Sequence, residues 1–264
     1  MFVNRSSQFI WKVTITEVHK AFGWIMSRSA GDTSNVGTLN ALNSQYRLKS
    51  DVFTEKDLVA REPIAQFKEW FELAIQKGIN EPNAMCLATA TKDGIPSARY
   101  VLLKGYGKDG FRFFTNYKSR KGHELAANPK AALVFYWEPL KRSVRIEGTV
   151  EKLPVVDSDA YFASRWRDSQ IGTSVSEQSS VIPSRSTLTA LEEKMKVEYE
   201  GREIPRPEFW GGYILIPHAV EFWQGQTDRI HDRIKFRRPK TDEKPDGIML
   251  HEGEDGWVFE RLSP

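Results

Sequence analysis

Short apolar segments joined by tight turns constrain the fold of this chain more than any other feature. Residues 84–91 lead into the turn Lys92-Asp93-Gly94, and residues 97–104 follow directly after it. Turns this short join only antiparallel strands, because a parallel pair needs a long crossover connection. Further strands are expected at residues 111–115, 131–137, 143–152, 212–216, 219–223, 229–237 and 257–261. The pattern predicts an α+β fold with an antiparallel barrel of about six or seven strands, since closure removes exposed edges, and with helices packed outside.

Helical signals mark the segments between these strands. Pro63 suits the first position of an amphipathic helix, and Ser119 and Ser186 suit the N-caps of two others. A fourth helix is expected at residues 158–165. The polar stretch at residues 168–185 is expected to be a loop.

The chain is expected to form one domain, residues 61–264, behind an N-terminal tail. Residues 1–60 show no sustained hydrophobic period and are predicted to be largely disordered. Basic residues outnumber acidic ones near the start, as in a mitochondrial transit peptide, but an unstructured tail has the same composition. No apolar stretch approaches the roughly 20 residues of a transmembrane helix. The cytoplasm is the expected location.

Charge and cysteine content exclude several classes of site. A net charge of +3 over 264 residues is too small to indicate a nucleic-acid-binding protein. The basic residues cluster locally, at Arg120-Lys121 and at residues 229–238, which favours a small anionic ligand. The single cysteine, Cys86, excludes an internal disulfide, and its apolar neighbours predict a core position. The histidines never pair at ligand spacing, so no metal site is expected.

Two segments carry residue types that bind phosphate. Residues 113–121 run from a strand end into a helix N-terminus with Ser119, Arg120 and Lys121, where Thr115 can contribute and Arg99 would reinforce the site if it faces the same pocket. A capped helix with solvated basic residues is the alternative.

A weaker cluster follows along the chain. Tyr161 and Arg165 are neighbours on one helix face, and Ser169 comes shortly after them. Lys104 ends its strand and could join such a site or remain a solvated lysine.

The stretch from Glu221 to Arg238 suggests a third anion site. If residues 229–237 form a strand, then Arg229, His231 and Arg233 project from one face. Two cations and an imidazole there would suit a phosphate, whereas the alternative is a solvated strand face.

Five motifs in this order resemble the pyridoxine (pyridoxamine) 5′-phosphate oxidase family, with the animal enzymes most similar. The resemblance covers residues 62–264. The motifs are SARYVLLKG at 97–105, FFTN at 113–116 with SRK at 119–121, QIG at 170–172, QSS at 178–180, and FWQG at 222–225 with RIHDR at 229–233.

The resemblance implies a split β-barrel homodimer with FMN at the subunit interface. It implies oxidation of pyridoxine or pyridoxamine 5′-phosphate to pyridoxal 5′-phosphate, with O2 reduced to H2O2, in vitamin B6 metabolism. Carried over by motif, the FMN contacts are Arg99, Tyr100, Val101, Leu102, Phe114, Thr115, Arg120, Lys121, Gln178, Ser179, Trp223 and Arg233. The implied substrate contacts are Lys104, Tyr161, Arg165, Ser169, Arg229 and His231, of which the last two would flank C4′ and are the catalytic candidates.

Two positions depart from the family pattern. Ser143 stands where the family has a glutamine that reaches the flavin. The family has an arginine just before the tyrosine that matches Tyr46 in the expected substrate lid, and residues 43–45 here include none. Two alternatives stay open: a split-barrel FMN reductase of another substrate, and a non-catalytic carrier of pyridoxal phosphate. The two departures bear on the carrier.

Overall fold

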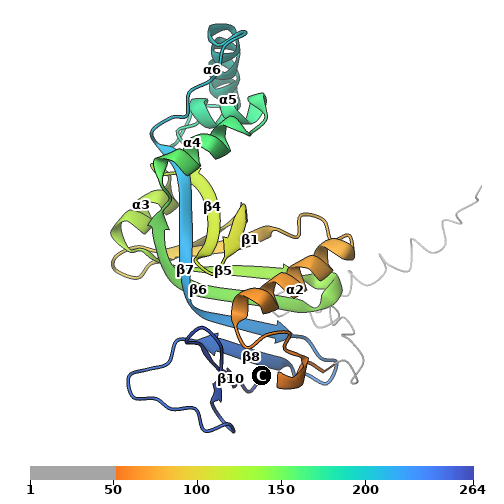
Figure 1. Cartoon of the computed structure of the whole chain (residues 1–264). Helices are drawn as coiled ribbons and strands as arrows, with labels where there is room; N and C mark the ends of the chain where they lie inside the picture. Colours follow the sequence, from red (N-terminus) through yellow and green to blue (C-terminus); the bar gives the residue numbers. More distant parts are fainter. Residues whose placement is uncertain (1–51) are drawn as a thin grey trace, which may run out of the picture. The chain divides into compact units, whose positions relative to one another are not determined.

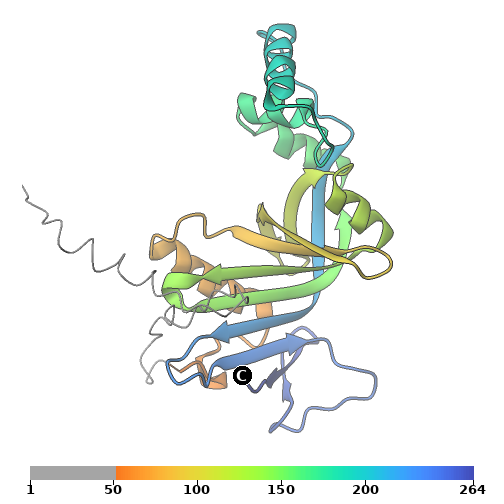
Figure 2. The same ribbon diagram turned by 180° about the vertical axis from the view of Figure 1, so that it is seen from behind.

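The computed structural model describes residues 52–264, so the predicted tail over residues 1–51 and the lid near Tyr46 lie outside the described part. The described chain forms an antiparallel sheet with helices around it (Figures 1 and 2). Its strands are β1 (Ala84–Ala90), β2 (Pro96–Leu102), β3 (Gly105–Gly107), β4 (Gly110–Asn116), β5 (Lys130–Trp137), β6 (Arg142–Lys152), β7 (Trp210–Gln224), β8 (Asp232–Arg237), β9 (His251–Glu252) and β10 (Val258–Arg261). Its helices are η1 (Glu55–Asp57), α2 (Pro63–Gln76), α3 (Arg120–Ala127), η2 (Glu138–Leu140), α4 (Val155–Ala163), α5 (Arg167–Val175) and α6 (Arg185–Glu198). In this part of the chain no helix has the length and apolar character needed to span a membrane.

The sheet branches at β7, its longest strand. One edge of β7 pairs with β6, while the other edge pairs first with β4 and then with β8. All ladders are antiparallel, as the short turns predicted. The strand order β2-β1-β5-β6-β7-β8-β10-β9 does not return to β2, so the described strands form an open ten-stranded sheet where a closed barrel was predicted. A strand as long as β7 can serve two partners on one edge, and the sheet forks there.

Strand β7 is continuous, although the sequence predicted two strands interrupted at Pro217. The ladder to β6 shifts register between Glu147 and Gly148, so a β-bulge at His218 absorbs one extra residue. The backbones approach closely at this point, because a Cβ on Gly148 would lie 2.3 Å from the carbonyl oxygen of Ile216. The bulge lets one strand reach from the α4–α6 helices to β8 (Figure 1).

Helix α2 covers the sheet with an aromatic face. It begins at Pro63 as predicted, and the Glu62 side chain caps it by accepting N–H groups of the first turn. Phe67 is fully buried, with its ring centroid 5.0 Å from that of Phe111. Gly78, at φ 67°, follows the helix in the left-handed conformation that glycine favours.

The core also includes residues before the expected start of the domain. Phe53 is buried, with its ring 4.9 Å from that of Trp70, and its N–H donates to Asp232 (2.9 Å). The tail was predicted to reach residue 60, whereas Phe53 already belongs to the core.

A smaller apolar cluster holds α4, α5 and α6 at the start of β7 (Figure 1). Ile171 of α5 is buried there with Phe162 of α4 and Trp210 of β7. The loop predicted at residues 168–185 is therefore wrong for its first part, which is helical. Tertiary packing of one apolar residue outweighs the weak helix propensity of this polar segment.

Two predictions for single residues differ from the structure. Helix α6 begins at Arg185, so Ser184 occupies the N-cap position predicted for Ser186. Cys86 is only half-buried, because the alternation of β1 turns Met85 and Leu87 toward the core instead.

Candidate active site

The start of helix α3 gathers hydrogen-bond donors beside the end of β4. The Ser119 hydroxyl accepts the N–H of Gly122 (3.3 Å), which is the predicted cap. Lys121 is only 8% exposed, and its Nζ donates to Gln178 Oε1 (2.7 Å). Thr115 Oγ1 donates to the same amide oxygen (3.3 Å). The structure therefore brings Thr115, Lys121 and Gln178 together.

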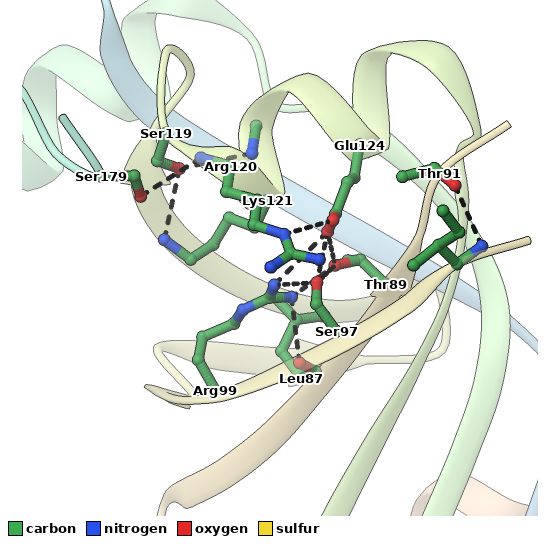
Figure 3. Close-up of polar contacts among 12 residues, drawn as sticks. Leu87, Thr89, Thr91, Ser97, Arg99, Ser119, Arg120, Lys121, Glu124 and Ser179 are labelled. Carbon is green, nitrogen blue, oxygen red and sulfur yellow. Dashed lines mark hydrogen bonds and ion pairs between the residues drawn. The ribbon is translucent and has the colours of Figure 1, made fainter. Parts of the chain in front are cut away.

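Two hydrogen bonds dock the loop 176–180 against this helix start. Asn116 Nδ2 donates to the Ser176 carbonyl (3.2 Å), and the Arg120 N–H donates to Ser179 Oγ (3.3 Å). The partners are 60 and 59 residues apart in the sequence. Figure 3 shows Ser179 beside Arg120.

Arg99 of β2 points to the same place from the sheet (Figure 3). Its guanidinium donates to the Leu87 carbonyl (3.2 Å) and to the hydroxyls of Thr89 and Ser97. It also forms an ion pair with Glu124 of α3 (3.4 Å). Arg99 is thereby fixed between β1 and α3.

A cavity of about 780 Å³ joins these residues to the predicted substrate cluster. Its predicted lining residues are Arg99, Tyr100, Val101, Leu102, Lys104, Phe114, Thr115, Lys121, Tyr161, Arg165, Ser169 and Gln178. Arg120 and Ser179 line an adjacent cavity of about 710 Å³ that shares Gln178 with it. We call these 14 residues, counted from the two cavities, the pocket cluster.

Aromatic rings arrange two cations of the cavity, Lys104 and Arg165. Tyr161 stacks on Phe114 with ring centroids 4.0 Å apart, and Lys104 Nζ lies 5.9 Å from the centre of the Tyr161 ring. The Arg165 guanidinium lies 4.8 Å from the centre of the Trp210 ring. The i, i+4 pair predicted on one helix thus faces the cavity, although Arg165 follows the last residue of α4.

Burial makes two of these cations favourable partners for an anion. Burial, and next the charge of Arg99, lowers the pKa of Lys121 from 10.5 to about 8. Burial also lowers the pKa of Arg165, whose guanidinium donates to the neutral Thr173 hydroxyl (2.6 Å). A bound anion would stabilise the charged form of each group.

The remaining predicted residues lie at the other end of β7. Ser143 of β6 pairs in register with Trp223, and Trp223 pairs with Arg233 of β8. The Trp223 ring lies 4.9 Å from His231. We call Ser143, Trp223, Arg229, His231 and Arg233 the strand-end cluster.

The predicted common strand face of Arg229, His231 and Arg233 is wrong. Strand β8 begins only at Asp232, and Arg229 lies in a turn at φ 68°, which breaks the alternation of side chains. The N–H of Gln226 donates to His231 Nδ1 (2.9 Å). Burial, followed by the charge of Arg229, lowers the pKa of His231. Arg229 and His231 therefore belong to a structured turn, and Arg233 to the strand.

A buried carboxylate holds Arg233 in place. Glu221 accepts from Arg233 Nε (2.7 Å) and from Arg145 (2.5 Å). Arg233 also donates to the Ser263 carbonyl (2.8 Å), so the chain end contributes to this site. Ser143 donates its hydroxyl to the Phe135 carbonyl (2.8 Å) within the sheet.

Arg165 of the pocket cluster and the strand-end cluster lie at opposite ends of β7. Trp210, beside Arg165, begins β7, and Trp223 is next to its last residue. A strand rises about 3.3 Å per residue, so on the order of 40 Å of strand separates Trp210 from Trp223. Even with the bend of β7 in Figure 1, one small ligand cannot touch both Arg165 and His231 of the same chain.

Sequence reasoning missed several residues of the site. Glu124 and Glu221 hold predicted arginines, and Trp210 supports Arg165. Glu124 lies four residues after Arg120 on α3, a spacing that could have indicated the pair. The partners of Glu221 lie on other strands, and short-range spacing cannot identify them.

Comparison with known proteins decides the family. The family described as pyridoxamine 5′-phosphate oxidase matches residues 71–195, and the pyridoxine 5′-phosphate oxidase C-terminal dimerisation region matches residues 210–264. A Bombyx mori protein named pyridoxine/pyridoxamine 5′-phosphate oxidase is 56% identical over 229 residues, covering 86% of this chain and 89% of that protein. The chain belongs to the pyridoxamine 5′-phosphate oxidase family.

A second relative and two solved structures are also similar to this chain. The Bos taurus pyridoxine-5′-phosphate oxidase is 56% identical over 228 residues, covering 86% of this chain and 87% of that protein. PhzG from Burkholderia lata, solved with tetrahydrophenazine-1-carboxylic acid, superposes with a TM-score of 0.71 at 30% identity, covering 81% of this chain and 98% of PhzG. An FMN-binding relative from Nostoc punctiforme shares the fold, with a TM-score of 0.56 at 15% identity over 75% of this chain and 97% of that one. The resemblance identified from the five motifs is confirmed.

Proposed function

We propose that this chain uses FMN to oxidise pyridoxine 5′-phosphate or pyridoxamine 5′-phosphate to pyridoxal 5′-phosphate. One observation carries the proposal: two groups of anion-binding side chains line a single cavity of about 780 Å³. Arg99 and Lys121 form one group, next to Gln178. Lys104 and Arg165 form the other, beside aromatic rings. FMN and the substrate each carry one phosphate, so the two groups match the two ligands.

The donors around Lys121 fit the phosphate of FMN. Lys121 is buried and its pKa is lowered to about 8, so an anion would stabilise its ammonium form. Arg99, Arg120 and Thr115 would supply further donors to the same phosphate. FMN, when bound, supplies the two-electron acceptor for the oxidation.

The substrate phosphate would bind between Lys104, Arg165, Tyr161 and Ser169. Arg165 is partly desolvated over Trp210, and Tyr161 is fixed by its stack on Phe114. Side chains held this rigidly bind and orient a phosphate with little further ordering. They would place the reacting C4′ carbon toward the flavin end of the cavity.

His231 is suited to orient the substrate by donating a hydrogen bond. Its Nδ1 accepts the Gln226 N–H, so the neutral imidazole carries its proton on Nε2. The lowered pKa of His231 favours this neutral form. We therefore assign His231 and Arg229 to positioning the oxygen or nitrogen on C4′. Oxidation removes one hydrogen from C4′ as a hydride and one from the attached oxygen or nitrogen as a proton, and O2 takes up both as H2O2. With the amine, water then converts the imine to the aldehyde and releases ammonia.

We further propose that each site is completed by a second copy of the chain. Arg229 and His231 are too distant from Arg165 of the same chain to share one substrate molecule with it. Apart from Ser143, the strand-end cluster lies within residues 210–264, which match a dimerisation region. A two-fold dimer would bring the strand-end cluster of one protomer to the pocket cluster of its partner, with FMN at the interface. The proposed split barrel is supported by the Lys104 N–H, which donates to the Arg112 carbonyl (2.9 Å) and so places the end of β2 beside β4.

A spectrum and a peroxide assay test the proposal. The purified protein should be yellow and should produce H2O2 with pyridoxamine 5′-phosphate in air. A yellow protein without turnover would favour a reductase of another substrate. A flavin-free protein that binds pyridoxal phosphate would favour a carrier.

A further inference from the structure

Glu124 is a buried carboxylate that lies among the proposed phosphate-binding arginines (Figure 3). Its side chain is 5% exposed. One oxygen, Oε1, accepts from Arg120 Nε (2.9 Å), and the other, Oε2, pairs with Arg99 (3.4 Å). A single carboxylate on α3 therefore contacts two arginines, one from its own helix and one from β2.

Two hydroxyls strengthen the link between Glu124 and Arg99. Thr89 Oγ1 and Ser97 Oγ donate to Glu124 Oε2 at 2.5 Å and 2.6 Å, and both accept from the Arg99 guanidinium. Thr89 and Ser97 pair in register across β1 and β2, so the sheet fixes both oxygens. The Arg99 guanidinium therefore contacts the Glu124 carboxylate directly and also through the two fixed hydroxyl groups.

The carboxylate is ionised under ordinary conditions. Burial alone would raise the pKa of Glu124, but hydrogen bonds from Ser97, Thr89 and Arg120 outweigh it and lower the pKa to about 2. A negative charge therefore lies close to a site proposed to bind a negative phosphate. As a charge alone, Glu124 would weaken phosphate binding.

The contacts that Glu124 makes with the arginines should instead strengthen phosphate binding. Arginine side chains lose much conformational freedom when they bind a ligand, and a site that has ordered them beforehand binds more tightly. The Arg120 side chain is 58% exposed and that of Arg99 is 21% exposed, so neither is confined by packing alone. The contacts with Glu124 supply the missing restraint.

We propose that Glu124 is a positioning residue that orders Arg99 and Arg120 for the flavin phosphate. The inference rests on the proposed FMN site. In it Glu124 strengthens FMN binding, whereas its negative charge alone would weaken it. Thr89 and Ser97 contact neither proposed ligand, but they belong to the hydrogen-bond network through which Glu124 orders Arg99.

The test compares flavins with and without a phosphate. FMN and riboflavin are titrated by fluorescence into the full-length protein after its flavin has been removed. Glu124→Gln keeps the side-chain volume and removes the charge. We expect it to weaken FMN binding by about tenfold, while riboflavin affinity changes less than about twofold. Ser97→Ala removes one bridging hydroxyl and keeps the carboxylate. It should weaken FMN binding by a smaller factor and should likewise leave riboflavin affinity nearly unchanged.

Glu177→Gln is the matched control for charge. Glu177 is exposed and lines the cavity beside Arg120, and among the described residues no hydrogen bond joins its carboxylate to either arginine. Its substitution removes the same charge without disturbing the network, so FMN affinity should stay constant or rise slightly.

The outcomes separate this inference from the function on which it rests. Unchanged or tighter FMN binding by Glu124→Gln would overturn the positioning role, as would equal weakening of FMN and riboflavin. If Glu124→Gln does not fold, the same criteria apply to Ser97→Ala. A wild-type protein that binds FMN no better than riboflavin would instead overturn the proposed flavin site.

Discussion

Lys121 is the single residue whose chemistry depends most on its surroundings. Its pKa of about 8, against an ordinary 10.5, means that part of the population loses the ammonium charge at mildly alkaline pH. An anion binds the charged form, so FMN affinity should be constant below pH 8 and fall as the pH rises above it, by up to about tenfold per pH unit. Lys121→Arg keeps its charge and should abolish the decline. Fluorescence titration of FMN between about pH 7 and 9.5 measures this, with riboflavin as the phosphate-free control. A parallel decline in both proteins would assign the titration to another group.

Arg229 and Arg233 should have separate roles. Arg233 is held in β8 by Glu221, whereas Arg229 lies in the turn beside His231. A charge-assisted hydrogen bond contributes about 1.5–3 kcal/mol. Arg229→Ala should therefore purify yellow but lose at least about tenfold in kcat/KM for pyridoxamine 5′-phosphate. Arg233→Ala should release FMN and regain activity with excess FMN, and Lys235→Ala on the same strand is the control. Equal loss of FMN in both arginine variants would show that the two arginines serve one flavin site.

For single residues, the sequence predicted the features that depend on neighbours in the chain. Ser119 caps α3, because helix capping is a short-range property. Gln178, 57 residues from Lys121, was assigned to the same site only through the family motifs. Glu124 was missed, since its importance depends on contacts with two strands that only the fold brings near. The shared face of Arg229 and Arg233 failed for one physical reason: a left-handed residue breaks the alternation that a strand would impose.

At the scale of elements, apolar periodicity predicted helices and strands where it was strong. Helix α2 and the ladder from β1 to β6 follow the pattern closely. Helix α5 was missed because it buries only Ile171, and β7 was divided because a bulge was not anticipated at His218. Both errors concern segments that long-range packing stabilises, and both segments position the pocket.

Helix α5 offers a prediction for one element. It carries Ser169 and also Thr173, which accepts from Arg165, and Ile171 anchors it in the cluster around Trp210. Ile171→Ala should destabilise the protein by about 2–5 kcal/mol, because it leaves a cavity in a buried contact. The loosened helix should raise KM for pyridoxamine 5′-phosphate more than it lowers FMN affinity. Urea unfolding and steady-state kinetics measure the two effects, and Leu191→Ala on the exposed part of α6 is the control. Loss of FMN without a change in KM would show that α5 serves the flavin instead.

At the scale of the whole molecule, the length of β7 determines where a complete site can form. The strand has Trp210, beside Arg165, at one end and Trp223, beside His231, near the other. On the proposed function, a single chain therefore carries two separate halves of the substrate site. The sequence could not reveal this separation, because motif order does not report distance along a continuous strand. Only a second copy can bring the halves together if both act on one ligand.

Mixed dimers test this arrangement. Lys104→Ala removes a residue of the pocket cluster, and Arg229→Ala removes one of the strand-end cluster, so each variant alone should be nearly inactive toward pyridoxamine 5′-phosphate. In a dimer of one chain of each kind, one site receives both defects and the other receives none. Equal co-expression with two affinity tags should restore about a quarter of the wild-type activity in the unfractionated mixture, and about half in the purified mixed dimer. The matched control pairs Lys104→Ala with Arg165→Ala, two pocket-cluster variants that cannot complement each other. Activity is measured as H2O2 production after gel filtration has shown that every variant is dimeric. If the first pair recovers no more activity than the control, each site is contained in one chain and the shared-site proposal is wrong.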